Sequence, residues 1–418
     1  MDLRLNRPEP IAPAAARSGP GFKEFVFLMA ALMSLNAFAI DAMLPALPAV
    51  GEALGVAREN ERQLVVTFYL VGFGLTQMVW GPLSDRYGRK PVLVVGLLLY
   101  AIFALLAAVA NSFTMLLAAR TLQGGAAATT RVLVTSVVRD RFEGALMAKV
   151  MSLTFIVFMA MPVLAPSFGQ LVVLVADWRA IFWGLAVWGA GMLVWTWLRL
   201  PETLNPANRR PISVVAVREA SLETLTNRVS LGYTVALMLM FGALMGYINS
   251  IQQIVFDVFE RPNLLALVFA AVAVPMALSS WANSHFVERV GVRRMAQWGL
   301  AAFTAVSALH LASSLLFTED LVVFMALQSV SMACFGLASS NMGAVAMQPL
   351  GHIAGTASSV QGTISTIGAA LIGAAIGQSF DGTTLPLVAG FVLLGSAGIA
   401  VLWWTEQGRL FVADPVKG

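Results

Sequence analysis

The chain has 418 residues, of which 58% are hydrophobic and only 11% are charged, and its mean hydropathy is +0.80. Soluble domains carry about 25% charged residues, so this composition excludes an ordinary soluble protein. The net charge of +4 does not indicate a nucleic-acid partner, because positive charge in membrane proteins marks cytoplasmic loops.

Apolar runs recur along the whole chain, and runs of about 20 residues can cross a ~30 Å hydrocarbon core as helices. A helix satisfies its own backbone hydrogen bonds in lipid, so we expect an all-α membrane protein. The twelve predicted membrane-spanning helices are 24–48, 64–83, 91–110, 113–138, 150–175, 179–199, 229–256, 264–284, 295–316, 320–345, 357–379 and 384–404.

The segments outside these runs divide the chain. Residues 1–21 are rich in Pro, Ala and Arg, and we expect them to be a disordered cytoplasmic segment rather than a secretory signal. The longest polar connection, 200–228, separates an N-terminal six-helix bundle (22–199) from a C-terminal six-helix bundle (229–404). Residues 405–418 form a short cytoplasmic tail.

The distribution of positive charge predicts the orientation. With both termini in the cytoplasm, twenty of the 26 Lys and Arg fall on the cytoplasmic side, four fall in outer loops, and two (Arg120 and Arg131) lie inside the fourth helix. This asymmetry follows the positive-inside rule. We expect a multi-pass protein of the cell (inner) membrane.

Two polar segments mark the first three helices. Residues 40–48 place Asp41 inside the first helix and follow it with Pro45 and Pro48. Residues 81–93 place three cations and one carboxylate, flanked by turn glycines, between two apolar runs. Charges are costly in lipid, so we expect a tight loop at the membrane surface.

The next two helices carry further motifs. The fourth contains Arg120–Gly125 (Arg-Thr-Leu-Gln-Gly-Gly), whose glycines allow close backbone approach beside the arginine. In the fifth, Pro162, Pro166 and Gly169 break the regular ladder and permit bending or tight packing against the eighth helix. Residues 288–294 repeat the spacing of the charged segment between helices two and three, which indicates an internal repeat.

These segments resemble the major facilitator superfamily, and within it the Bcr/CflA type of drug:H⁺ antiporter. The resemblance covers residues 24–404 and departs from the family pattern at Gln170, where a second glycine is usual. It implies two six-helix bundles with a substrate site between them near the membrane midplane. It also implies a proton-coupled antiporter that exports small amphipathic compounds by alternating access, with protons as the coupling ion and no other cofactor.

Asp41 and Arg120 are the proton-coupling residues that the resemblance implies. Asp41 is about nine residues (~13 Å) and Arg120 about eight residues (~12 Å) from the outer ends of their helices, so the two can lie at one depth. A charge at that depth costs ~2.5–3.5 kcal/mol and should face a cavity or a partner. We expect Asp41 to bind the proton and Arg120 to tune it; the alternative is a fixed ion pair that joins helices one and four.

The charged loop is expected to control the inner gate. In the family, its carboxylate caps the N-terminus of helix 11 when the inner gate is closed, which places an anion on a helix dipole. The alternative is a loop that only fixes topology. The predicted gating residues are Gly81, Asp85, Arg86, Gly88, Arg89 and Asp140.

A cavity is predicted around the two arginines of the fourth helix. Arg131 follows Arg120 by eleven residues, so the two are only ~20° apart around the helix. Arg131 attracts an anionic group or tunes a second protonation; alternatively, it extends toward the cytoplasmic surface. Scattered amides suit an amphipathic ligand with few fixed polar contacts. The other predicted cavity residues are Asn36, Tyr69, Gln77, Gln123, Asn249, Gln252, Gln253 and Asn341.

Other functions are less well supported by the sequence. Three histidines and one cysteine cannot build a metal cluster with the usual spacings, and no nucleophile–base pair indicates an enzyme. We expect a monomer in the lipid bilayer that binds a small amphipathic substrate and no nucleic acid. Two alternatives stay open: an exporter of one metabolite, such as an amino acid or a siderophore, and a non-transporting membrane sensor on the same fold.

Overall fold

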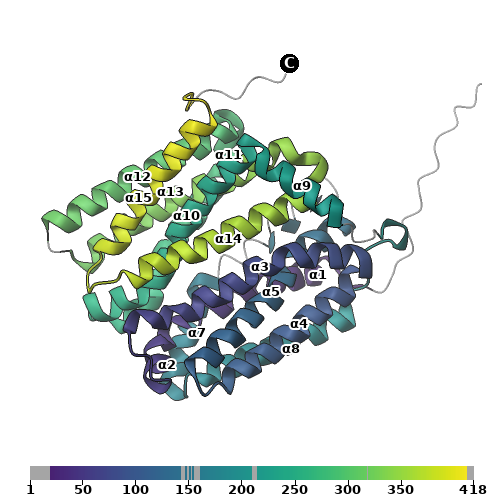
Figure 1. Cartoon of the computed structure of the whole chain (residues 1–418). Coiled ribbons are helices and arrows are strands. Elements are labelled where there is room, and N and C mark those ends of the chain that lie inside the picture. Colours follow the sequence, from purple (N-terminus) through teal and green to yellow (C-terminus); the bar gives the residue numbers. More distant parts are fainter. Residues whose placement is uncertain are drawn as a thin grey trace, which may run out of the picture.

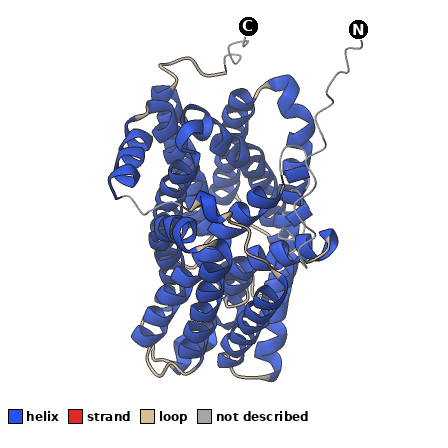
Figure 2. Cartoon of the chain, turned by 90° about the vertical axis from the view of Figure 1, so that its right-hand side faces the viewer, coloured by secondary structure: helices blue, strands red, loops and turns tan. Residues whose placement is uncertain are grey.

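The computed structural model describes residues 19–142, 146–147, 150–151, 153–154, 161–209, 214–317 and 319–411 (Figure 1). Within these ranges every regular element is a helix and no strand is present (Figure 2). The all-α prediction is therefore confirmed. The predicted disorder of residues 1–18, and residues 155–160 of the predicted fifth helix, lie outside the described residues.

The first predicted helix is interrupted where its prolines fall. α1 (Phe22–Asp41) ends at the carboxylate, a 3-10 turn follows at Leu44–Ala46, and α2 (Leu47–Ala53) completes the segment. Pro45 and Pro48 have no N–H to donate to the preceding turn, so a regular α-helix cannot continue through this stretch. The predicted first span is therefore one apolar segment, Phe22–Ala53, that is not a regular helix throughout.

The other long helices follow the predicted order. In the first half they are α3 (Leu64–Tyr87), α4 (Arg89–Ala108), α5 (Phe113–Arg141), α7 (Met161–Val175) and α8 (Arg179–Arg199). In the second half they are α10 (Arg228–Gln253), α11 (Leu265–Val290), α12 (Val292–Leu316), α13 (Leu321–Met347), α14 (Ala354–Gln378) and α15 (Leu385–Thr405).

The predicted polar connection 200–228 contains a helix of its own. This helix, α9 (Val214–Thr226), packs against α14. The side chain of Asn227 then accepts a hydrogen bond from the backbone nitrogen of Ser230 at 3.0 Å, and this cap begins α10. The connection is therefore partly folded rather than a linker throughout.

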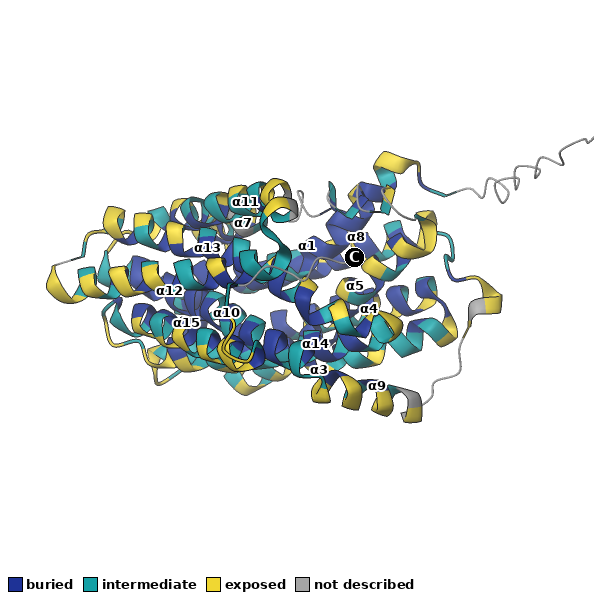
Figure 3. Ribbon diagram, turned by 90° about the horizontal axis from the view of Figure 1, so that it is seen from above, coloured by how far each residue is buried: buried dark blue, intermediate teal, exposed yellow. Residues whose placement is uncertain are grey.

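The long helices form two bundles. α1, α3, α4, α5, α7 and α8 pack with one another, and α10 to α15 do the same (Figure 1). The bundles meet along two helix pairs, α3 with α14 and α7 with α11, which lie side by side in Figure 3. This arrangement is the predicted fold class, whereas the residue limits of the two domains stay predictions.

The outside of the molecule is suited to lipid. Nine segments of the described chain are long and apolar enough to cross a membrane, one of which, 321–378, contains both α13 and α14. Large apolar side chains are exposed around the bundles, and a soluble monomer rarely exposes so much apolar surface. The chain is thus a multi-pass membrane protein, and the predicted number of twelve spans is consistent with these segments. Examples of the exposed side chains are Leu174, Val187, Trp197, Trp281, Leu315 and Trp403.

Two glycines bring α3 and α5 into backbone contact. A Cβ atom on Gly72 would fall on the carbonyl oxygen of Thr121, and one on Gly124 would fall on the carbonyl oxygen of Tyr69. Only glycine permits such an approach. The predicted role of Gly124 in close helix packing is confirmed, and the approach places the carbonyl groups of α3 beside the buried face of α5.

The charged segment between α3 and α4 is helical for most of its length. α3 continues to Tyr87 and α4 begins at Arg89, so the predicted loop is reduced to Gly88. Gly88 has a φ of +105°, which residues with a Cβ rarely adopt. Gly291 joins α11 to α12 in the same way, with a φ of +93°. Both halves of the predicted repeat thus use a one-residue glycine connection.

The close packing of α3 and α5 predicts a stability difference between two glycine variants. Gly124→Ala should destabilise the protein by about 1–3 kcal/mol, because the added methyl group overpacks a backbone contact. Gly191→Ala is the matched control, because nothing lies within 4 Å of its added Cβ on α8. Apparent thermal unfolding in detergent should fall for the first variant only; equal unfolding temperatures would contradict the contact.

Candidate functional site

Arg120 on α5 is fully buried, and its guanidinium group joins three helices. Its Nε donates to Val65 O at 3.2 Å, Nη2 donates to Ala39 O at 3.0 Å, and Nη1 donates to Gln123 Oε1 at 2.9 Å. Cζ lies 4.4 Å from the centroid of the Tyr69 ring, a cation–π contact. Ala39 belongs to the last turn of α1, where carbonyl groups lack a helical partner. The interruption of the first helix therefore supplies one acceptor for Arg120.

Asp41, the last residue of α1, is 4% exposed. Among the described residues it has no ion pair, so the fixed pair with Arg120 that the sequence left open is not formed in this structure. Tyr247 of α10 lies within electrostatic range of Asp41, and its hydroxyl group has no hydrogen-bond partner in the described part of the chain. The carboxylate of Asp41 is thus buried without a cation that would hold it in the ionised state.

The motif of the predicted fifth helix closes one side of this region. Pro166 lies inside α7, and a Cβ atom on Gly169 would fall on the carbonyl oxygen of Ala42, the residue after α1. α7 also contacts α11, as predicted, but Gly169 itself faces the first helix. Pro162 lies in the first turn of α7, and its side chain is outside the described residues. Gln170, the departure from the family pattern, donates to Pro262 O of the other bundle at 3.3 Å.

Polar side chains of α1, α3 and α5 form one chain of hydrogen bonds. Tyr69 Oη donates to Asn36 Oδ1 at 3.0 Å, and Asn36 Nδ2 donates to Thr130 Oγ1 at 3.1 Å. The predicted cavity residues Asn36 and Tyr69 therefore lie together. Thr130 was not predicted, because a threonine in a helix gives no signal that separates it from ordinary packing.

The two bundles are bonded to each other between α3 and α14. Gln77 Nε2 donates to Thr366 Oγ1 at 3.1 Å, and Thr363 Oγ1 donates to Gly74 O at 3.1 Å. The structure thus places Gln77, a predicted cavity residue, in the contact between the bundles.

The second bundle contributes amides of two kinds. Asn341 Nδ2 donates to Asn283 Oδ1 at 2.7 Å, a partner that the sequence did not indicate. Asn249 on α10 is 1% exposed, and neither of its amide atoms has a partner among the described residues. Gln252 on the same helix is buried as well. Asn249 and the buried Gln328 of α13 both have unused hydrogen-bonding capacity, which is typical of a site that binds water or a ligand.

Neutral amides join the two bundles at the ends that the sequence predicts to be the outer ones. Asn60 Nδ2 donates to Gln378 O at 3.0 Å and to Phe380 O at 2.8 Å, and Gln253 Nε2 donates to Asn60 Oδ1 at 2.9 Å. Gln63 Nε2 also donates to Gln253 Oε1. We name Asn60, Gln63, Gln253 and Gln378 the outer amide cluster. Gln253 was predicted in the cavity, and the structure places it in this cluster instead.

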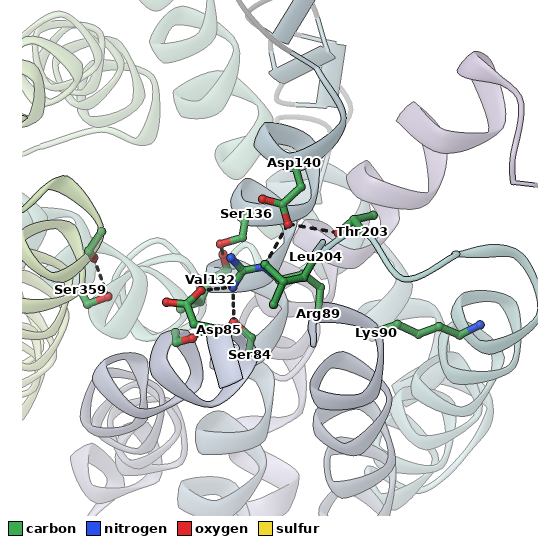
Figure 4. Close-up of polar contacts among 12 residues, drawn as sticks. Ser84, Asp85, Arg89, Lys90, Val132, Ser136, Asp140, Thr203, Leu204 and Ser359 are labelled. Carbon is green, nitrogen blue, oxygen red and sulfur yellow. Dashed lines mark hydrogen bonds and ion pairs between the residues drawn. The ribbon is translucent and has the colours of Figure 1, made fainter. Parts of the chain in front are cut away.

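Arg89 is the centre of the predicted gating segment. Its Nη1 lies 2.6 Å from Asp85 Oδ1 and donates to Ser84 Oγ at 2.6 Å, and its Nε donates to Asp140 Oδ2 at 3.1 Å (Figure 4). Arg89 is 4% exposed, so these contacts satisfy a buried cation. The predicted meeting of Asp85, Arg89 and Asp140 is observed in this structure.

The carboxylate of Glu202 is a further part of this region that the sequence did not indicate. It accepts hydrogen bonds from the backbone nitrogens of Arg89 at 2.9 Å and Lys90 at 3.2 Å, at the N-terminus of α4. An anion is favourable at a helix N-terminus. Arg86 lies apart, with its Cζ 5.3 Å from the ring centroid of Tyr87.

Asp85 does not cap α14 in this structure. No hydrogen bond joins it to Ser359 or to another described residue of that helix, although both residues appear in Figure 4. Ser359 instead donates to Gly355 O at 3.1 Å. A Cβ atom added to Gly81 would lie 3.9 Å from Ser359 Oγ. The predicted interaction of Asp85 with the eleventh spanning helix, which is α14, is therefore absent from this conformation.

Arg131 is exposed although it belongs to the inner face of α5. It lies only ~20° around the helix from the buried Arg120. It has no hydrogen bond or ion pair within the described residues. The structure thus leaves Arg131 exposed, and the cavity shared with Arg120 stays a prediction.

Comparison with known proteins gives one family. The model of the Major Facilitator Superfamily matches residues 26–373. A bicyclomycin resistance protein homolog of Haemophilus influenzae is 28% identical over 370 residues, which cover 87% of this chain and 91% of that protein. Multidrug resistance protein MdtL of Escherichia coli is 31% identical over 257 residues, 61% of this chain and 64% of that protein. The structure of the human organic anion transporter MFSD10 (TETRAN) has the same fold, with a TM-score of 0.66 at 17% identity, covering 92% of this chain and all of that one.

The outer amide cluster predicts a population shift that distance measurements can detect. Gln253→Ala removes two hydrogen bonds between the bundles, each of which contributes about 1 kcal/mol, so the ratio of closed to open outer ends should fall roughly thirtyfold. Spin labels at Arg58→Cys and Asn263→Cys, in a Cys334→Ser background, would report the distance across the outer end.

Asn111→Ala is the control for this measurement, because Asn111 is an exposed amide with no bond to the other bundle in the described structure. It should leave the distance distribution unchanged. An unchanged distribution in Gln253→Ala would show that the cluster does not hold the outer end closed.

Proposed function

The chain belongs to the Major Facilitator Superfamily and is therefore a membrane transporter rather than an enzyme, and we propose that it exports small amphipathic compounds in exchange for protons. The observation that carries this proposal is Asp41, a buried carboxylate in a spanning helix that has no cation partner among the described residues. Relatives named for resistance to bicyclomycin and to multiple drugs support drug efflux.

Asp41 has the properties that a coupling site needs. A buried carboxylate that is not paired can exchange a proton at modest cost, whereas a carboxylate in a fixed ion pair stays ionised. Arg120 is tied to backbone carbonyls and to Gln123, so it supplies a fixed positive charge near this region. Asp41 then binds the proton, and Arg120 tunes that binding and couples it to ligand occupancy.

The contacts between the bundles support alternating access, with this structure open to the inside. The outer amide cluster closes the outer end, and Arg131 is exposed on the inner side. Asp85 does not cap α14, and its cap forms when the inner end closes. When the outer end opens and the inner end closes, Asp41 and the bound compound become accessible from the other side of the membrane.

The proton gradient provides sufficient energy for such a cycle. One proton that enters in exchange for one neutral molecule gains about 2.3 kcal/mol per 100 mV of membrane potential and ~1.4 kcal/mol per pH unit. Together these sustain an export gradient of roughly several hundred-fold. The transporter works as a monomer in the cell (inner) membrane, with both termini in the cytoplasm and with no cofactor besides protons.

Export of a single metabolite is the second candidate within transport, and the exposed Arg131 favours it for a compound that carries an anionic group. A sensor that does not transport is the third. Proton-coupled transport requires that Asp41 bind and release a proton, whereas a sensor should tolerate the replacement of Asp41 by Asn.

Asp41→Asn tests the proposed coupling. Purified protein in weakly buffered detergent should release about one proton when a transported compound binds, because ligand and proton compete for Asp41. The variant should bind the compound without releasing protons, and proton-driven transport in vesicles should fall by two orders of magnitude or more, since the coupling proton has no site. A pH-sensitive dye measures both quantities.

Asp177→Asn is the matched control, because Asp177 is an exposed carboxylate between α7 and α8 that pairs with Arg179 at 3.4 Å. It should release protons as the wild type does. Proton release that persists in Asp41→Asn would place the coupling site elsewhere. If the wild type transports no compound and Asp41→Asn behaves like the wild type, the sensor is favoured.

A further inference from the structure

Two opposite charges in the first bundle lack partners. Asp41 is buried without a cation, and Arg131 has no carboxylate within the described residues. The third charge of this interior, Arg120, is satisfied by Val65 O, Ala39 O and Gln123. Unpaired charges in a membrane interior are costly, so their usual partners are ligands, ions or one another.

The two unpaired charges are at different depths. The hydrogen bond from Asn36 to Thr130 sets α1 and α5 at a common level. Asp41 lies five residues beyond Asn36 on α1, and Arg131 lies one residue beyond Thr130 on α5, which runs in the opposite direction. At 1.5 Å per residue the two charges differ in depth by ~9 Å. That difference is about the length of a small amphipathic molecule with one charged group at each end.

Arg131 belongs to a basic stripe that continues to the inner surface. Arg131, Thr135 and Arg139 are all exposed and follow one another at intervals of four residues, about 6 Å each, on one side of α5. Arg139 has no ion pair in the described structure. This basic stripe presents two guanidinium groups between the cytoplasm and the middle of the bundle.

The nearby carboxylates cannot neutralise the basic stripe because they already have partners. Asp85 and Asp140 both contact Arg89, at 2.6 Å and 3.1 Å. Glu202 accepts hydrogen bonds from the backbone nitrogens of Arg89 and Lys90. Within the described part of the chain no carboxylate is left for Arg131, so its positive charge is available to an anion from outside.

We propose that the substrate is a zwitterionic amphipathic molecule, whose carboxylate binds Arg131 and whose cationic group displaces the proton at Asp41. This inference rests on the proposed export function and names its substrate class. A carboxylate matches the planar fork of a guanidinium group. A purely anionic compound would be repelled by ionised Asp41, and a purely cationic compound by Arg131, so only the zwitterion satisfies both charges.

A set of four compounds on one scaffold tests the inference. The parent is a naphthalene that carries an aminoalkyl group at one end and a carboxylate at the other; the others are its methyl ester, its N-acetyl derivative and the doubly blocked neutral compound. Binding to the full chain in detergent is measured by the naphthalene fluorescence. The wild type should bind the parent roughly ten- to a hundredfold more tightly than either singly blocked compound, because each loses one charge-assisted contact.

Two variants should each remove one preference. In Arg131→Gln the parent should bind no better than its methyl ester, while the affinity for the ester stays as in the wild type. In Asp41→Asn the parent should bind no better than its N-acetyl derivative. Arg131→Lys should restore part of the preference for the carboxylate. Arg141→Gln is the control on the same helix, because Arg141 contacts the ring of Phe25 at 4.7 Å instead, and it should bind all four compounds as the wild type does.

The outcomes separate this inference from the export function. If the ester is bound and exported and the parent is no better, the zwitterion site is overturned while export stands. If the parent keeps its advantage over the ester in Arg131→Gln, the assignment of the carboxylate to Arg131 is overturned. If the wild type neither binds nor exports any of the four compounds, both proposals are overturned.

Discussion

The burial of Arg120 is the constraint on which the rest of the first bundle depends. A guanidinium group inside a membrane protein is stable only when its donors are satisfied. Two of its acceptors are backbone carbonyl groups, which come within reach because α3 and α5 touch at Gly124 and because α1 ends before Pro45. The charge therefore fixes the relative positions of α1, α3 and α5.

The interruption of the first helix, which supplies an acceptor to Arg120, also leaves Arg120 without an ion pair to Asp41. Arg120 uses its donors on carbonyl and amide oxygens, so it does not neutralise the carboxylate two residues beyond Ala39. A carboxylate that is buried but unpaired can change its protonation state, and one that is clamped cannot. This geometry supports the proposed division of the two charges between a structural role for Arg120 and an exchangeable one for Asp41.

The two ends of the transporter use different kinds of contact. The outer amide cluster joins the bundles by neutral hydrogen bonds, each worth about 1 kcal/mol, which can break and form during a cycle. The charged network of Arg89 lies within the first bundle, where Asp85, Asp140 and Glu202 are all its neighbours. A buried ion pair is costly to break, and this one joins residues of a single bundle.

The sequence by itself determined the all-α membrane class and the order of the helices, because the length of an apolar run is a local signal. It also determined the burial of Arg120 and the meeting of Asp85 with Arg89 and Asp140, because an isolated charge in an apolar run and a glycine-flanked charged segment are local signals too. Only the tertiary structure decided that Arg120 binds carbonyl groups rather than Asp41, that Gln253 joins the two bundles, and that Asn60, Glu202 and Asn283 complete these contacts. Backbone acceptors have no signature in the sequence. An amide on a helix can face a cavity or another helix equally well, and only the packing of the two bundles selects between them.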